Sequence, residues 1–145
     1  YLSSEPYTIE QEGKFKPQVF LLADNGYPGY AAFIMATDQM IADHPDDVQK
    51  FVDASIRGWV EYLYGDNAAA NELIKADNPE MTDALLAHGL ATLGIGAMTE
   101  ERWQRFAAEM SGTGVFPKDL DIHRAYTLEF VNRGVGNDLK AELTK

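Results

Sequence analysis

The amino-acid sequence predicts a helix-rich α/β protein whose strands lie in the first quarter of the chain. Two apolar runs of strand length occur there, at 18–23 and 30–36, and the remainder follows the spacing of amphipathic helices. The chain has 145 residues, 46% of them hydrophobic, which is enough to bury a core of ordinary size. Its 12 glycines and 6 prolines are close to average usage, so disordered and fibrous classes are excluded.

The first predicted element is a short helix over 7–12. Ser4 can cap this helix and Gly13 can end it. The Lys16–Pro17 pair then disfavours a helical backbone, so the run at 18–23 is expected to be a buried strand.

The second apolar run, 30–36, follows a turn at 24–26, and Thr37 can cap a short helix after it. Two adjacent strands do not form a stable sheet alone, because an isolated hairpin is marginal and open edges pair with other chains. The partners of both strands are therefore expected outside this sequence.

The strongest helix is predicted over 45–64, with Pro45 at its start and a glycine directly after it. Its apolar residues form one continuous face, and we expect that face to bury Phe51, Ile56 and Trp59. Four further helices are predicted at 66–75, from 78–80 onward, at 99–112 and at 121–132. Glycines 134 and 136 are expected to end the structured part, so that the residues after them form a polar tail.

Charge and composition exclude several functions. The net charge is −11 and no run of lysine or arginine occurs, so nucleic acid and anionic membrane surfaces are not expected partners. The absence of cysteine excludes disulfides, thiolate metal sites and cysteine nucleophiles. The longest apolar stretch, 30–36, is far shorter than the roughly 20 residues that a membrane-spanning helix needs.

The sequence offers few catalytic or metal-binding signals. His44, His88 and His123 show no metal-ligand spacing, and each is expected at the surface or as a cap, so neither a metal site nor a cofactor is predicted. Ser4 and Glu5 form either a catalytic cluster or a polar recognition surface. Without a histidine or lysine beside them, nucleophilic catalysis has little support.

Two candidate binding positions also have structural interpretations. Glu5 stands where a carboxylate usually stabilises the start of a helix. Tyr27 and Tyr30 flank a Pro–Gly pair and can present rings to a planar ligand or simply cover a turn, and their spacing alone favours the turn.

Several motifs, in their order along nearly the whole chain, resemble one family. The sequence is similar to the C-terminal half of periplasmic solute-binding proteins of ABC importers, in the class that serves nitrate, sulfonates, taurine and thiamine-pyrimidine precursors. The motifs are Tyr1-Leu-Ser-Ser-Glu-Pro-Tyr7, Ala23-Asp-Asn-Gly-Tyr-Pro28, Ala36-Thr-Asp38 with His44-Pro45-Asp46, Ala54-Ser-Ile-Arg-Gly-Trp59, Gly94-Ile-Gly-Ala-Met-Thr99 and Ala125-Tyr-Thr-Leu-Glu-Phe130.

The resemblance implies the C-terminal portion of a two-lobed type II periplasmic binding protein fold, with the N-terminal half missing. Residues 1–17 would end the second lobe with a cleft segment and a short helix. Residues 18–24 would be a crossing strand, and 25–145 the mostly helical C-terminal part of the first lobe. The missing half, or another copy of the chain, would then supply the absent strand partners.

The same resemblance implies a receptor that captures a small nutrient for a membrane permease, in the periplasm or lipid-anchored outside the cytoplasmic membrane. It assigns ligand binding to Glu5, with Ser4, Tyr1 and Tyr27 as further candidates. A carboxylate accepts hydrogen bonds from an aminopyrimidine and repels a sulfonate or nitrate, so a thiamine-pyrimidine-like ring is favoured.

Two other functions remain open at this point. One is a pyrimidine-precursor biosynthetic enzyme of the same superfamily, although those enzymes use a cysteine-rich motif and this chain has no cysteine. The other is a helical interaction domain without a ligand.

Overall fold

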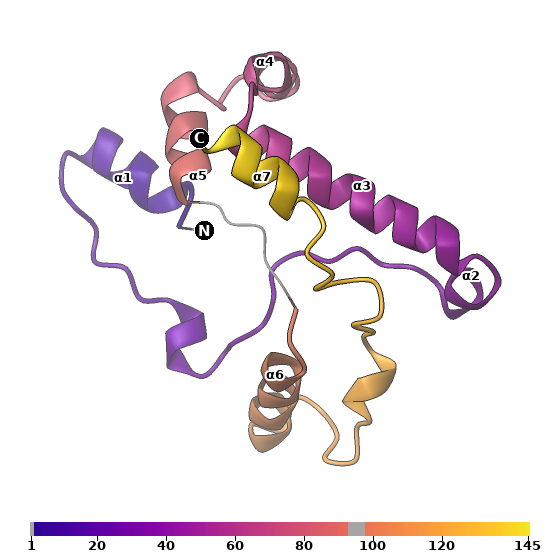
Figure 1. Cartoon of the computed structure of the whole chain (residues 1–145). Helices are drawn as coiled ribbons and strands as arrows, with labels where there is room; N and C mark the ends of the chain where they lie inside the picture. The colour runs from indigo at the N-terminus through magenta and orange to yellow at the C-terminus, as the bar shows by residue number, and fades with distance from the viewer. Residues whose placement is uncertain (1, 93–97) are drawn as a thin grey trace. The chain divides into compact units, whose positions relative to one another are not determined.

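The computed structural model describes residues 2–92 and 98–145, and every regular element among them is helical (Figure 1). Tyr1 and the Gly94–Gly96 motif lie outside the described residues. None of the helices in the described part is both long and apolar enough to cross a membrane.

The elements are α1 (Glu5–Gly13), η1 (Leu22–Asn25), α2 (Asp38–Asp43), α3 (Pro45–Tyr64), α4 (Ala68–Asp77), α5 (Asp83–Thr92), α6 (Glu100–Gly112), η2 (Ile122–Arg124) and α7 (Asn137–Leu143).

The chain divides into two compact units, each assembled from separate stretches of sequence. Unit 1 consists of Tyr1–Val19, Ala54–Ile95 and Val135–Lys145. Unit 2 consists of Phe20–Asp53 and Gly96–Gly134.

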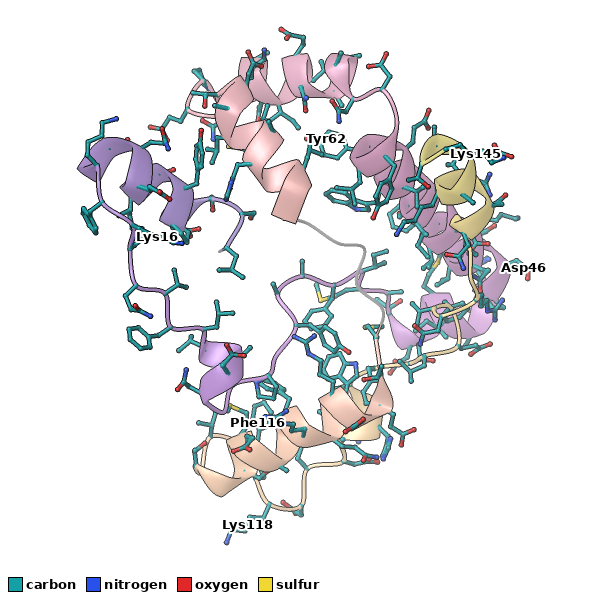
Figure 2. All side chains as sticks on the ribbon, turned by 60° about the vertical axis from the view of Figure 1, so that its left-hand side comes forward. Lys16, Asp46, Tyr62, Phe116, Lys118 and Lys145 are labelled. Carbon is teal, nitrogen blue, oxygen red and sulfur yellow. The ribbon has the colours of Figure 1, made fainter. Side chains whose placement is uncertain are left out.

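In unit 1, α7 lies along the second half of α3 (Figures 1 and 2). Gly136 adopts a left-handed backbone at φ +80° immediately before α7, and its Cα lies so close to α3 that an added Cβ would be 3.0 Å from Val60 Cγ2. An ion pair of 3.5 Å between Arg57 and Asp138 flanks this contact. The Lys140 ammonium lies 4.6 Å from the centroid of the Tyr64 ring.

Side-chain amides join α3 to α4 in the same unit. The Tyr62 hydroxyl donates to Asn71 Oδ1 at 3.0 Å, and Asn71 Nδ2 donates to Asn67 Oδ1 at the same distance. Asn67 in turn donates to the Tyr62 carbonyl at 3.0 Å. These three hydrogen bonds attach the start of α4 to the end of α3.

In unit 2, aromatic packing on α6 forms the core. Trp103 and Met110 are buried side chains of α6. Phe130, which follows η2 in the chain, is also buried. The first half of α3 adds the buried Val48 and Val52. Gln49 Nε2 donates to the Phe130 carbonyl at 3.2 Å and thereby attaches this part of α3 to the later segment.

The helix-rich character is confirmed for the described residues, but the two predicted strands are wrong. Residues 18–21 and 30–36 have no regular secondary structure, and Leu22–Asn25 is a 3₁₀ turn instead of the end of a crossing strand. A strand forms only where a neighbour satisfies its backbone groups, and neither segment has a paired strand in this part of the chain. The division of 1–17, 18–24 and 25–145 between two lobes stays a prediction.

Three helix predictions need correction. The helix expected from 78–80 begins at Asp83, because the Asn78 side chain accepts from the Glu80 amide at 3.1 Å and forms a turn. The helix expected over 121–132 is only the 3₁₀ turn η2, because the following residues turn to pack Phe130 into the core. The polar tail expected after Gly136 is helix α7.

The expected burial on α3 is also wrong for two residues. Phe51 and Trp59 are 61% and 52% exposed, and only Ile56 is half-buried. The buried positions of α3 are Val48, Val52 and Val60, since these face the segments that the chain itself supplies.

Gly136→Ala should lower the free energy of unfolding by about 1–2 kcal/mol, because a side chain is costly in the left-handed region and the new Cβ would crowd Val60. Gly58→Ala is the matched control, since nothing lies within 4 Å of its Cβ position inside α3. That change should raise stability by about 0.5–1 kcal/mol. Urea denaturation measures both, and a Gly136 variant as stable as the wild type would contradict the close contact.

The two tryptophans should respond very differently to truncation. Trp103→Ala should cost about 3–5 kcal/mol, as for other large buried aromatic residues. Trp59→Ala removes an exposed ring and should cost less than about 1 kcal/mol. Denaturation followed by circular dichroism measures both changes, and equal losses would disprove the assigned core.

Candidate functional site

Glu5 and Ser4 lie together at the start of α1. The Ser4 hydroxyl donates to the Glu5 carboxylate, and Ser4 occupies the N-cap position without bonding the helix backbone through its side chain. Hydrogen bonds from the Ser4 hydroxyl and from the Glu5 amide lower the pKa of the Glu5 carboxyl. The carboxylate is therefore ionised at neutral pH and able to accept hydrogen bonds.

Helix α5 supports the turn that carries Glu5. The rings of Tyr7 and His88 stack with centroids 4.6 Å apart, and both side chains are half-buried. Gly89 is buried next to them, with the Ser3 carbonyl 3.8 Å from where its Cβ would lie. His88, expected at the surface or as a cap, thus contributes to the packing of α1 on α5.

Tyr27 belongs to unit 2, where it borders a hollow among aromatic rings. Tyr27 is 47% exposed, and its ring meets that of Phe106 edge to face, with centroids 5.2 Å apart. The hollow has a volume of about 190 Å³. We call it the aromatic pocket, and its lining consists of Tyr27, Gly29, Tyr30, Phe33, Trp103 and Phe106.

Trp103 is the central residue of this pocket's wall. Its ring is parallel to that of Tyr126 at 4.8 Å between centroids and also stacks with Phe33 at 5.2 Å. Burial of the neighbouring Tyr126 ring raises the pKa of its phenol, so this group stays neutral. The Trp103 indole N–H is buried, and no acceptor for it is found among the described residues.

Arg102 holds the segment 28–30 against α6. Its Nε donates to the Pro28 carbonyl at 2.8 Å, and Nη2 donates to the Gly29 carbonyl at 3.0 Å. The guanidinium also lies 4.2 Å from the centroid of the Tyr30 ring. The positively charged guanidinium of Arg102 thus positions the backbone of residues 28–30.

Thr99 caps α6 as its sequence predicts. Its hydroxyl accepts from the Arg102 amide at 3.3 Å, and its own amide donates to the Tyr30 hydroxyl at 2.8 Å. The start of α6 is thereby attached to Tyr30, which lines the aromatic pocket.

The predicted site residues fall in different parts of the structure. Ser4 and Glu5 are adjacent in unit 1, Tyr27 lies in unit 2, and Tyr1 lies outside the described residues. Sequence reasoning missed the contacts of Arg102 and the buried N–H of Trp103; the spacing of Trp103, Phe106 and Met110 on one helix face is the signal that could have found a buried tryptophan. Among residues 2–92 and 98–145, no group of three or more metal-ligating side chains is positioned to hold a metal ion.

Comparison with known proteins gives two matches. The family model described as NMT1/THI5 like matches residues 1–70. The riboflavin-binding protein RibY of Chloroflexus aurantiacus is 26% identical over 157 aligned positions, which cover 92% of this chain and 42% of that protein. The chain thus spans about two fifths of the length of the curated relative that it matches. No solved structure matches the chain.

Together these matches confirm the resemblance found in the sequence. The chain is similar to solute-binding proteins of the class that serves nitrate, sulfonates and thiamine precursors.

Proposed function

We propose that this chain is part of a solute-binding receptor that captures a small nutrient and delivers it to an ABC permease. The family match over 1–70 and the similarity to a binding protein support a role in solute binding. Such a receptor works outside the cytoplasmic membrane, in the periplasm or on a lipid anchor. No chemical step is part of this role.

The position of Glu5 is the observation that carries the proposal. Glu5 lies inside the matched segment, at the first turn of α1, and its carboxylate is ionised at neutral pH. An ionised carboxylate accepts paired N–H groups and repels an anion placed against it. We therefore propose a neutral or cationic heteroaromatic solute, with an aminopyrimidine preferred to a sulfonate or nitrate.

The ligand-contacting residues belong to the same proposal. Glu5 accepts N–H groups of the solute, and Ser4, Tyr1 and Tyr27 are the further contact candidates. The similarity to a riboflavin-binding protein makes a flavin the natural competitor, since a flavin is also a planar heteroaromatic. Both ligand types therefore belong in one experiment.

Glu5→Gln in the intact receptor should weaken binding of 4-amino-5-hydroxymethyl-2-methylpyrimidine by about 1.5–3 kcal/mol, which is the scale of a charged hydrogen bond. Glu12→Gln is the matched control, because Glu12 is an exposed carboxylate on the same helix. Isothermal titration of the wild type and both variants, with riboflavin as a second ligand, measures the effect. If Glu5→Gln leaves the affinity unchanged but lowers the melting temperature, Glu5 only stabilises the helix.

Native mass spectrometry of the receptor released from its host tests the function itself. A retained small heteroaromatic molecule is the expected result. A retained sulfonate or nitrate would refute the proposed ligand class, and failure of every candidate solute to bind in titration would refute the receptor role.

A further inference from the structure

We propose that Asn25 is a modification site, at which the side-chain amide is lost without an enzyme and the residue becomes aspartate or isoaspartate. Of the asparagines in the sequence, only Asn25 is followed by a glycine, Gly26. Both residues belong to unit 2 and lie at the end of the 3₁₀ turn η1. The proposal does not depend on the proposed receptor function.

The reaction needs only water as a second reactant. The Gly26 amide nitrogen gives up its proton to the solvent and attacks Cγ of Asn25 with its electron pair. The bond between Cγ and Nδ2 breaks, Nδ2 takes up a proton and leaves as ammonia, and a cyclic imide remains in the backbone. Water then adds to one of the two imide carbonyl carbons and breaks its bond to the Gly26 nitrogen. Cleavage at Cγ leaves aspartate, whereas cleavage at the main-chain carbonyl leaves isoaspartate.

The reacting groups lie at the surface of unit 2. Asn25 is exposed, and Gly26 has no side chain to shield its amide nitrogen. Apart from its chain neighbours, only Glu109 Oε2 among the described residues comes within 4 Å of the position of a Cβ on Gly26, at 3.9 Å. The other asparagines precede residues that carry a side chain, and they are Asn67, Asn71, Asn78, Asn132 and Asn137.

Hydrogen bonds keep the closed turn unreactive. The Gly26 amide donates to the Leu22 carbonyl, and Asn25 Nδ2 donates to the Leu21 carbonyl at 2.8 Å. An N–H that donates in this way does not readily lose its proton, and the side-chain amide is held back along the turn. The reaction therefore requires η1 to open first.

Opening of η1 requires little free energy. The turn has four residues, none of them buried, and hydrogen-bond geometry in 3₁₀ turns is poorer than in α-helices. Leu22 is 71% exposed, so its side chain adds little packing. Segments of this kind open locally at free energies far below that of global unfolding. We therefore expect Asn25 to react in the folded chain.

The modification adds a negative charge beside two other carboxylates. Asp24 precedes the modified residue, and Glu109 lies near Gly26. The new carboxylate also cannot donate, so the hydrogen bond to the Leu21 carbonyl is lost. Repulsion between like charges and the loss of this bond both favour the open turn.

The effect reaches Tyr27, which follows Gly26 directly. The Tyr27 amide donates to the Leu22 carbonyl at 2.9 Å, and the Tyr27 ring packs against Phe106. An open turn loses the first contact and loosens the second. Loss of the Asn25 amide therefore alters one side of the aromatic pocket.

Ageing of the intact chain at mildly alkaline pH tests the proposal. Peptide mapping by mass spectrometry follows every asparagine in buffer and in urea. Asn25 should be converted first, to a mixture that contains isoaspartate. Its rate in buffer should stay within about a hundredfold of its rate in urea, because local opening is sufficient. A rate in buffer below that limit, or earlier conversion of another asparagine, would overturn the proposal.

Gly26→Ala tests the attacking group. In urea, where the turn is absent, the added Cβ should slow conversion of Asn25 several-fold by shielding the nitrogen. Gly112→Ala is the matched control in the same unit and should leave the rate unchanged. An unchanged rate in the Gly26 variant would refute attack by the Gly26 nitrogen.

Asn25→Asp reproduces the product that has a normal backbone. Hydrogen exchange of the Tyr27 amide should become about five- to tenfold faster, as expected for the loss of one hydrogen bond. Asn137→Asp adds the same charge at an exposed position of unit 1 and should leave this exchange unchanged. Equal exchange in the wild type and the Asn25 variant would disprove the effect on Tyr27.

Discussion

In unit 2 the indole of Trp103 lies parallel to the Tyr126 ring, with 4.8 Å between centroids, and this stack joins α6 to the segment around η2. Its neighbour in sequence, Arg102, holds the carbonyls of Pro28 and Gly29. Two adjacent side chains on one helix therefore hold two segments that are remote in sequence and contain neither an α-helix nor a strand at these contacts. With no sheet among the described residues to organise unit 2, these contacts determine where its loops lie and give the aromatic pocket its walls.

The two units carry different chemistry. Unit 1 offers an ionised carboxylate at the first turn of α1, supported from behind by the stack of Tyr7 on His88. Unit 2 contains an aromatic hollow, and the buried Trp103 indole N–H has no acceptor among the described residues. A carboxylate accepts hydrogen bonds, whereas an indole N–H only donates them.

Periodicity and capping predicted the long helix over 45–64 and the helix that Thr99 caps, because both depend on local sequence. The strands at 18–23 and 30–36 could not be judged in the same way, since an apolar run becomes a strand only when a partner pairs with it. Local spacing also suggested a helix over 121–132, but tertiary packing of Tyr126 and Phe130 prevailed. The resemblance to a family assigned ligand binding to Glu5. That the Trp103 N–H has no acceptor among the described residues can be recognised only from the structure around it.

The composition of the two units also has a consequence for synthesis on the ribosome. Unit 1 takes its last segment from Val135–Lys145, after all of unit 2 has been translated. Gly136 and α7 are therefore made about 75 residues after the half of α3 that they contact, given the contact between Gly136 and Val60. Unit 2 can fold while the chain is still being made, but the side chains of α3 that contact α7 stay uncovered until translation has passed α7. A nascent chain stalled before that point presents a finished unit 2 beside an incomplete unit 1, which is the state that a chaperone would meet.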